Sequence, residues 1–264
     1  MRLAPSQADQ LNRALVTSVP IDAPTEPRAR PTQRHSPIAT DRAIGPDRPL
    51  PTAREGFRRF VNVVVALVGL TLALPAMAVI ALFVRLSSSG PILYVQTRVG
   101  INRRRARLGV GASRREADVG GRPFRIFKFR TMRLQSDEAS EVWASPDDPR
   151  VTSIGRLLRR SRLDELPQLW NVLRGDMNVV GPRPEQPGIL VDLREQIERY
   201  GDRQFVRPGI TGWAQVNQSY DSCLDDVRRK VAYDLEYIAR QSTLEDLKIM
   251  ALTVPVMVLR KGAW

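Results

Sequence analysis

The sequence predicts an α+β fold: a membrane-associated monotopic domain with one re-entrant, proline-kinked membrane helix, amphipathic interfacial helices and a small β element. Three observations predict it. A nearly unbroken apolar run covers residues 60–84, two short segments with strand patterns follow, and most later segments have helical periodicity. We divide the chain into a disordered leader at 1–56, the membrane helix at 57–86 and a cytoplasmic domain at 87–264 with a basic insertion at 102–121.

The leader is predicted to be disordered because of its composition. Residues 1–56 hold nine of the 20 prolines and show little apolar periodicity. No apolar h-region follows the first charges, so the leader does not resemble a secretory signal.

The apolar run of about 25 residues is long enough to cross a bilayer. Pro75 lies inside it and removes a helix hydrogen bond, which favours a kink. Positive charge flanks both ends, at Arg58 and Arg59 before the run and at Arg85 after it, and such charge keeps a flank on the cytoplasmic side. A helix that enters, bends at Pro75 and leaves by the same face satisfies both flanks. The alternative is a single spanning helix.

The remaining elements follow from shorter patterns. Residues 92–96 are predicted as a short strand, and 124–129 alternate apolar and charged side chains, as expected of a strand with one wet face. Helices are predicted over residues 185–200, 224–240 and 244–259. The last of these is apolar on one side, so it belongs either at the membrane interface or in the core.

The charge of the chain is concentrated. Lys and Arg total 41 against 28 Asp and Glu, a formal net charge of +13, and residues 98–133 contain twelve basic and two acidic residues. Such a block predicts a polyanionic partner, either nucleic acid or an anionic membrane surface. A solvated basic loop is the other interpretation.

Cysteine and histidine are nearly absent. Cys223 and His35 are each the only residue of their type in the sequence. The chain therefore has no disulfide framework and no zinc cluster, and Ser-His-Asp or Cys-His catalysis is excluded. Any chemistry must use carboxylates, Lys, Arg, hydroxyls or a bound metal.

Two adjacent carboxylates, Asp164 and Glu165, are the best candidates for chemistry. Pro167 lacks an N–H and fits only the first turn of a helix, so a helix is predicted to begin near Asp164. A carboxylate there meets unpaired backbone N–H groups and the positive end of the helix dipole, which favour its ionised form. The alternative is that Asp164 only caps the helix.

Basic side chains lie near this pair in the sequence. The alternation at the second strand places Lys128 and Arg130 on one face, Arg162 comes just before the carboxylates, and Arg183 sits in the rigid turn 181–184. Arg offers a two-pronged fork to phosphate and Lys a point charge. An ordinary amphipathic edge strand and a structural turn are the alternatives.

Four motifs in this region resemble those of a known family. Asp-Glu-Leu-Pro-Gln-Leu-Trp-Asn at 164–171, Arg-Gly-Asp-Met at 174–177, Val-Val-Gly-Pro-Arg-Pro-Glu at 179–185 and Arg-Pro-Gly-Ile-Thr-Gly-Trp-Ala-Gln-Val-Asn at 207–217 are similar to motifs of the bacterial sugar transferases, the monotopic phosphoglycosyl transferases. The resemblance covers about residues 57–264.

The resemblance implies an activity and a location. Members of the family transfer a phosphosugar from a UDP-sugar to polyprenol (undecaprenyl) phosphate and release UMP, the initiating step of exopolysaccharide or other surface glycan assembly. A covalent aspartyl-phosphosugar is the expected intermediate. The catalytic domain is then expected on the cytoplasmic face of a bacterial inner membrane, with a UDP-sugar, polyprenol phosphate and membrane lipid as partners and without nucleic acid. A homo-oligomer is compatible with the sequence.

The resemblance also implies roles for single residues. Asp164 is the expected nucleophile, and Glu165 is either a metal ligand or a general base. A Mg²⁺ ion held by Asp164 or Glu165 is the expected cofactor. The residues expected to bind substrate are Lys128, Arg130, Arg162, Arg183 and Arg207.

Two rival functions remain at this stage. A membrane-tethered glycosyltransferase would move only the sugar and release UDP. A non-catalytic, membrane-tethered binder of polyanions would suit the basic block, but it gives no reason for Asp164 and Glu165, because carboxylates repel polyanions.

Overall fold

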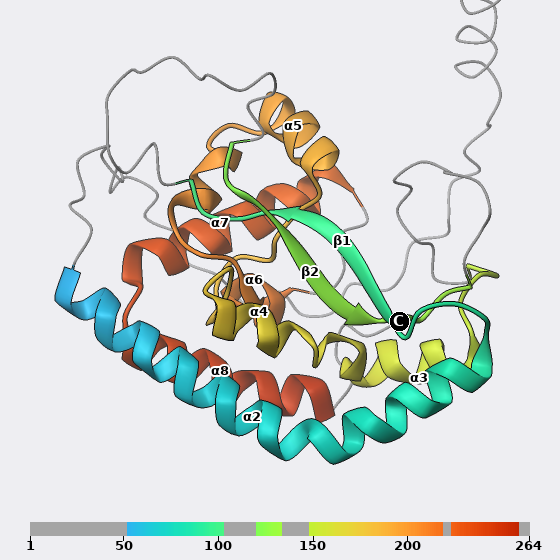
Figure 1. Cartoon of the computed structure of the whole chain (residues 1–264). Coiled ribbons are helices and arrows are strands. Elements are labelled where there is room, and N and C mark those ends of the chain that lie inside the picture. Colours follow the sequence, from blue (N-terminus) through green and yellow to red (C-terminus); the bar gives the residue numbers. More distant parts are fainter. Residues whose placement is uncertain (1–51, 103–119, 134–147, 219–222, 259–264) are drawn as a thin grey trace, which may run out of the picture. The chain divides into compact units, whose positions relative to one another are not determined.

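The computed structural model describes residues 52–102, 120–133, 148–218 and 223–258, which all lie in one compact unit, Ile44–Trp264. The predicted leader lies outside the described residues apart from its last few, and so does most of the predicted basic insertion at 102–121. The described part is a mixture of helices and two small sheets (Figure 1).

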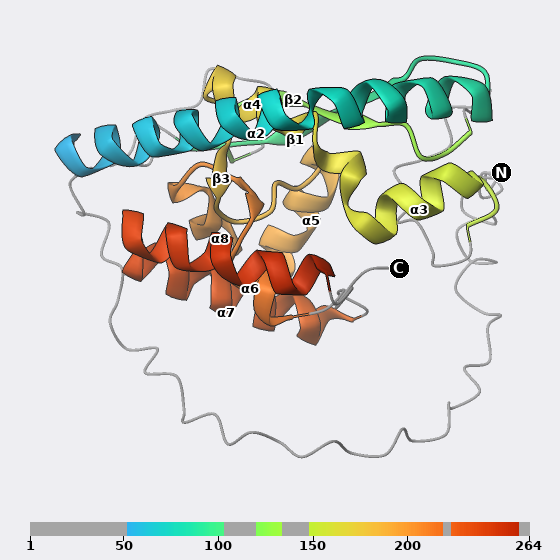
Figure 2. The ribbon, with the colours of Figure 1, turned by 90° about the horizontal axis from the view of Figure 1, so that it is seen from below.

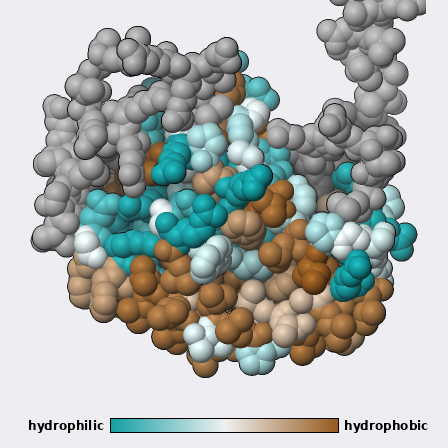
Figure 3. Space-filling view, in the orientation of Figure 1, coloured by the Kyte–Doolittle hydropathy of each residue, from teal (hydrophilic) through white to brown (hydrophobic). Residues whose placement is uncertain are grey.

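A long apolar helix, α2 (Thr52–Ser87), opens the described chain. It contains Pro75 and changes direction part-way along (Figure 1). Within the described ranges it is the one helix long and apolar enough to cross a membrane, and only 11% of its most apolar stretch is buried. Exposed apolar side chains line it, among them Phe60, Leu67, Val68, Leu72, Leu74, Val79, Leu82, Phe83 and Leu86. They form the apolar band along the lower side of Figure 3.

The first half of α2 is fastened to the rest of the unit through one face. Arg58 donates to Asp246 at 2.7 Å, and the backbone N–H of Val179 donates to Asn62 Oδ1 at 2.6 Å. Arg59 donates to carbonyl oxygens in the last turn of the helix at 168–174 and to that of Met177 just after it. Arg58 and Arg59, which flank the apolar run, therefore bond to other parts of the folded unit.

The second half of α2 is fastened to the same unit. Ile80 and Val84 are buried in a cluster with Phe129 and Leu158. Arg130 donates to the carbonyl oxygens at the end of the helix, at 3.2 Å for Val84 and 2.7 Å for Ser88. One face of α2 thus packs on the unit near both of its ends.

The two predicted strands are confirmed as an antiparallel pair, β1 (Leu93–Val99) and β2 (Pro123–Phe129). Asn171 bonds to the free edge of β2: its Nδ2 donates to the Arg125 carbonyl at 2.6 Å, and its Oδ1 accepts from the Phe127 N–H at 3.1 Å. Asn171 therefore fixes the ribbon against the helix that carries it.

A second, parallel pair joins β3 (Asn178–Val180) to β4 (Gly209–Thr211). Glycine is needed here because the two backbones nearly touch. A Cβ on Gly209 would lie 2.1 Å from the backbone N of Gly181, and a Cβ on Gly181 would lie 2.4 Å from the Arg207 carbonyl oxygen. The two glycine-containing motifs of the sequence are thus neighbours in space.

The helices agree in part with the predictions. The segment predicted at 224–240 is α7 (Leu224–Arg240), that at 244–259 is α8 (Thr243–Val258), and that at 185–200 is a shorter α5 (Pro187–Gln196) followed by a 3₁₀ turn, η2 (Tyr200–Phe205). Elements without a sequence prediction are α3 (Ser153–Ser161) and α6 (Trp213–Asn217). Between them lie η1 (Leu163–Glu165) and α4 (Gln168–Arg174).

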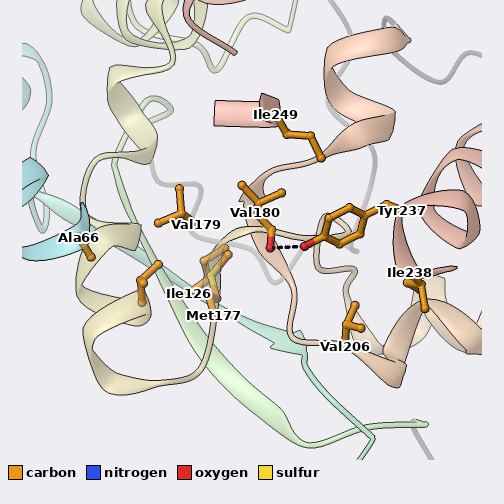
Figure 4. Packing of buried hydrophobic residues seen from close by; sticks show 10 residues of the cluster. Ala66, Ile126, Met177, Val179, Val180, Val206, Tyr237, Ile238 and Ile249 are labelled. Carbon is orange, nitrogen blue, oxygen red and sulfur yellow. Dashed lines mark hydrogen bonds between the residues drawn. The ribbon is translucent and has the colours of Figure 1, made fainter. Parts of the chain in front are cut away.

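The core joins elements that are far apart in the sequence (Figure 4). Ala66 of α2, Met177 and Val180 around β3, Tyr237 of α7 and Ile249 of α8 are all buried in one cluster. The prediction that the last helix is apolar on one side is only part of its pattern, because α8 has apolar side chains both in the core and on the surface. One face of α8 buries Ile249, while Leu244, Leu247, Leu252, Val254 and Met257 are exposed. In Figure 2, α2 and α8 both run along the side nearest the viewer.

Candidate active site

The two candidate carboxylates lie on η1, between α3 and α4. Arg162 precedes them in the left-handed backbone region, with φ of 53°, and turns the chain sharply after α3. The prediction that a helix begins near Asp164 is wrong, because η1 is a single 3₁₀ turn and α4 starts at Gln168, after Pro167. Asp164 and Glu165 are 9% and 7% exposed, so both carboxylates are largely withdrawn from water.

Glu165 lies between two cations that come from different parts of the chain. Lys128 Nζ, from β2, is 3.1 Å from Glu165 Oε1, and Arg183 Nη2, from the turn after β3, is 2.7 Å from the same oxygen. Burial by itself raises the pKa of Glu165, but Arg183 and Lys128 outweigh it and hold that pKa below its usual range. Glu165 is therefore ionised at neutral pH.

Asp164 is in a different environment. Its side chain makes no hydrogen bond with the residues that the structure describes. Burial, and then the negative charge of Glu165, raise the pKa of Asp164 to about 6, against the opposing charges of Lys128 and Arg183. The expectation that backbone N–H groups hold Asp164 ionised is wrong, because no such group bonds to it here. At pH 7 it is still mostly a carboxylate, and a poorly solvated one.

Arg159 also belongs to this cluster, and sequence analysis missed it. Its positive charge lowers the pKa of Asp164, and its Nε donates to Thr131 Oγ1 at 3.0 Å. The signal in the sequence is a run of basic residues on α3 that ends just before the carboxylates. Such a run is also typical of a solvated helix face, so the pattern does not single out Arg159.

Two predicted phosphate ligands have other partners. Arg130 lies just after β2 and binds the carbonyl oxygens at the end of α2, so the predicted pairing of Lys128 and Arg130 in one cradle is not found. Arg207 Nη1 is 2.7 Å from Glu55 Oε1, near the start of α2. The structure thus places Lys128 and Arg183 on Glu165, whereas Arg130 and Arg207 attach α2.

A buried ionic network supports the turn that carries Arg183. Arg203 donates to the Arg183 carbonyl oxygen at 3.1 Å and to Asp234 Oδ2 at 2.7 Å, and its guanidinium stacks 4.9 Å from the centre of the Tyr200 ring. Glu185 follows the turn and lies 3.0 Å from Lys230 Nζ. These bonds fix the backbone of the turn, so the Arg183 side chain extends from a backbone that is held in place.

The described residues contain no group of three or more His, Cys, Asp or Glu side chains that could hold a metal by themselves. Mg²⁺ commonly uses one or two carboxylates together with substrate phosphates and water. Asp164 and the Oε2 atom of Glu165 make no hydrogen bond with described residues, so the pair fits that kind of site.

Comparisons with known proteins identify the family of the chain. A model of the bacterial sugar transferase family matches residues 53–260. The chain is 39% identical over 220 residues to the UDP-glucose:undecaprenyl-phosphate glucose-1-phosphate transferase of Escherichia coli K12, which covers 83% of this chain and 44% of that protein. It is 39% identical over 224 residues to the protein of the same name from Caulobacter vibrioides, covering 84% of this chain and 77% of that protein.

A third relative is named for a different sugar. The chain is 37% identical over 206 residues to the UDP-N-acetylgalactosamine-undecaprenyl-phosphate N-acetylgalactosaminephosphotransferase of Aeromonas hydrophila, covering 78% of this chain and 44% of that protein. The chain thus spans less than half the length of two of these three relatives. Because the family model covers most of the chain, the protein belongs to the bacterial sugar transferase family.

Proposed function

We propose that this protein transfers a phosphosugar from a UDP-sugar to a polyprenol phosphate and releases UMP, as the first step of a surface glycan. Family membership and the activities for which the relatives are named support this reaction. The observation that carries it is the environment of the carboxylate pair. A buried Asp164 without a hydrogen-bond partner among the described residues lies beside Glu165, which holds two cations in place.

Asp164 acts as the nucleophile in this proposal. Its carboxylate oxygen attacks the β-phosphorus of the UDP-sugar, a new O–P bond forms, and the electron pair of the broken P–O bond leaves with UMP. A phosphate oxygen of the polyprenol phosphate then attacks the same phosphorus, and the Asp164 carboxylate is restored. The product is a polyprenol diphosphosugar. Poor solvation of Asp164 makes its carboxylate more reactive toward phosphorus.

Cations are needed because two anions must approach each other. Two like unit charges about 4 Å apart repel by about 4 kcal/mol at intermediate dielectric, which corresponds to roughly three decades in rate. Lys128, Arg183 and Arg159 supply the compensating charge. Without substrate, Lys128 and Arg183 form ion pairs with Glu165. We propose that a substrate phosphate replaces Glu165 in part of these contacts.

Mg²⁺ fits the same place. When bound through Asp164 or Glu165 together with the diphosphate, it would neutralise charge that develops on the departing UMP. A general-base role for Glu165 is less favoured, because a phosphate monoester has a second pKa near 6 and is already largely ionised at neutral pH.

We further propose that α2 enters the bilayer and leaves it by the same face, with the catalytic unit in the cytoplasm. The apolar, exposed side of α2 supports insertion. Arg58 and Asn62 near one end, and Val84 near the other, contact the same folded unit, and this supports return to one face. A helix that crosses a hydrocarbon core of about 30 Å would separate its ends.

The decisive experiment measures the released nucleotide. Purified protein in lipid nanodiscs is incubated with polyprenol phosphate and a panel of UDP-sugars that includes UDP-glucose and UDP-N-acetylgalactosamine. We expect UMP from at least one of them. Asp164→Asn should abolish this release and also the labelling of protein by the phosphosugar. Asp192→Asn is the matched control, because Asp192 is an exposed acid on α5.

Other outcomes would favour the rivals. Accumulation of UDP would identify a glycosyltransferase that moves only the sugar. Salt-sensitive binding of polyanions without any nucleotide release would identify a non-catalytic binder. Labelling that persists in Asp164→Asn would place the nucleophile elsewhere.

A further inference from the structure

A cavity of about 200 Å³ adjoins Glu165, the second carboxylate of the pair. Its walls come from η1 and α4 on one side and from β4, α6 and α8 on the others. The apolar side chains that line it are Leu166, Leu169, Ile210, Val216, Val256 and Met257. The cavity is therefore built by segments that are distant in the sequence and that converge beside Glu165.

The chemistry of the walls selects the kind of ligand. Thr211 and Thr253 also line the cavity, but their hydroxyls bond to each other at 2.8 Å. The surface left to a ligand is predominantly hydrocarbon. Gln215 also lines the cavity, and its Oε1 is a buried acceptor without a partner among the described residues. One such acceptor is too little to replace the hydrogen bonds that a uracil ring, a ribose or a hexose makes with water. A branched hydrocarbon loses none.

The cavity connects two regions of different character. Arg162 and Glu165 form the wall on the catalytic side. Met257 of α8 lines the cavity and is 38% exposed, close to Val254, which is 60% exposed on the same helix. The cavity thus reaches an exposed, apolar part of α8, and the ribbons of α8 and α2 run on the same side of the described unit in Figure 2. A lipid that enters from the membrane would meet the cavity before the carboxylates.

We propose that this cavity holds the first isoprene units of the polyprenol phosphate, with the phosphate directed to Arg162 and Glu165. This inference rests on the proposed function, because it assigns a binding site to the acceptor of that reaction. The proposed occupant is the prenyl chain rather than the acyl chain of a bulk phospholipid. Arg162 and Glu165 border the cavity, and the acceptor phosphate must come close to these two residues to reach the neighbouring Asp164.

The first test fills the cavity. Val256→Phe places a larger side chain in it, and Val254→Phe makes the same change two residues away on an exposed position of α8 that does not line it. We expect Val256→Phe to raise the KM for a long-chain prenyl phosphate at least tenfold relative to Val254→Phe. Exchange of labelled UMP into the UDP-sugar, which needs no acceptor, should persist in both variants.

The outcomes separate the two proposals. If the wild-type protein exchanges no UMP, the proposed function fails whatever the cavity does. If exchange persists and the two variants have the same KM for the prenyl phosphate, the cavity is not the acceptor site and the inference is overturned.

A second test needs no variant. A prenyl phosphate with a diazirine on its first isoprene unit is photolysed with the wild-type protein in phosphatidylglycerol vesicles, and the labelled peptides are identified. We expect labels on the segments 166–169 and 253–257, displaced by unlabelled prenyl phosphate. Labelling confined to α2, or equal labelling by a diazirine phospholipid, would contradict a prenyl-specific site.

Discussion

Asp164 and Glu165 are adjacent in the sequence, yet the structure shifts their pKa values in opposite directions. Both are buried, and burial alone raises the pKa of a carboxyl group. Glu165 has Lys128 and Arg183 within ion-pair distance, which lowers its pKa. Asp164 has no such contact and also feels the charge of Glu165, which raises its pKa to about 6. Glu165 thereby holds two cations, and the raised pKa of Asp164 suits the nucleophile that we propose.

The first prediction concerns the pH dependence of the reaction. In the proposed reaction only the ionised form of Asp164 attacks phosphorus, so the rate of UMP release should fall as pH decreases through about 6. It should fall nearly tenfold for each further pH unit, because one proton is involved. Single-turnover UMP release between pH 5 and pH 8 checks this. A rate that stays constant down to pH 5 would contradict it.

The second prediction concerns stability. The pKa of Asp164 is raised from 3.8 to about 6, so between these values the folded protein binds more protons than the unfolded chain, and stability falls as pH rises across the window. The loss is on the order of 3 kcal/mol above pH 6. Asp164→Asn does not ionise, so its Tm should exceed the wild-type Tm at pH 7.5, and the difference should shrink toward pH 4.

Thermal unfolding in detergent at several pH values measures this difference. Glu165→Gln serves as the contrast. It removes the partner of Lys128 and Arg183, so it should lower the Tm at pH 7.5. A Tm difference for Asp164→Asn that does not change with pH would show that burial does not perturb this carboxyl.

At the scale of elements, α2 is joined to the catalytic unit by buried polar bonds as well as by apolar contact. Arg58 donates to Asp246 through Nε at 3.0 Å and through Nη2 at 2.7 Å, and Nη2 also donates to the Tyr237 hydroxyl at 3.0 Å. Tyr237 in turn lies 3.2 Å from the Val180 carbonyl oxygen, as Figure 4 shows. One network therefore connects α2, α8, α7 and β3.

The third prediction tests this network. Arg58→Met leaves Asp246 buried without its cation and should destabilise the protein by about 3–5 kcal/mol, because the two side chains are only 9% and 4% exposed. The double variant Arg58→Met with Asp246→Asn should cost clearly less than the sum of the two single changes. Tm values and denaturation midpoints of all four proteins complete the cycle. Additive effects would contradict direct coupling.

At the scale of the whole described unit, exposed apolar side chains lie along one side, and the helix that carries most of them is attached to the elements of the candidate active site. The exposed apolar side of α2 forms the lower band in Figure 3, and α8 runs on the same side in Figure 2. The Arg58 and Arg130 contacts attach both halves of α2 to the unit that carries Asp164. This arrangement suits a reaction between a water-soluble donor and an acceptor that stays in lipid.

The fourth prediction concerns the orientation of α2 in the membrane. In a Cys223→Ser background, cysteines at Phe57 and at Leu86, which are 60% and 73% exposed, should both react with an impermeant maleimide from the cytoplasmic side only. Serine is suitable at position 223 because the residue there caps α7 and Ser is a favoured N-cap. Reaction of the two positions from opposite sides would falsify the re-entrant path.

Several features of the fold follow from local patterns. The alternation at 124–129 predicted β2, and the apolar periodicity of the segments at 224–240 and 244–259 predicted α7 and α8 almost to the residue. The short strands β3 and β4 were not predicted, because three residues carry too little pattern. Their pairing depends on close contact between Gly181 and Gly209, which are distant in the sequence.

The sequence by itself determined the family, the apolar helix with its internal proline, the segments that form β1 and β2, and the adjacency of the two candidate carboxylates. These features reside in consecutive residues, so neighbouring positions suffice to specify them. Only the tertiary structure decided that Lys128 and Arg183 bind Glu165, that Arg130 and Arg207 attach α2, and that Asp164 has a raised pKa. Ion pairing and desolvation depend on which distant segments meet and on how much water they exclude. Neither can be read from the pattern of neighbouring residues.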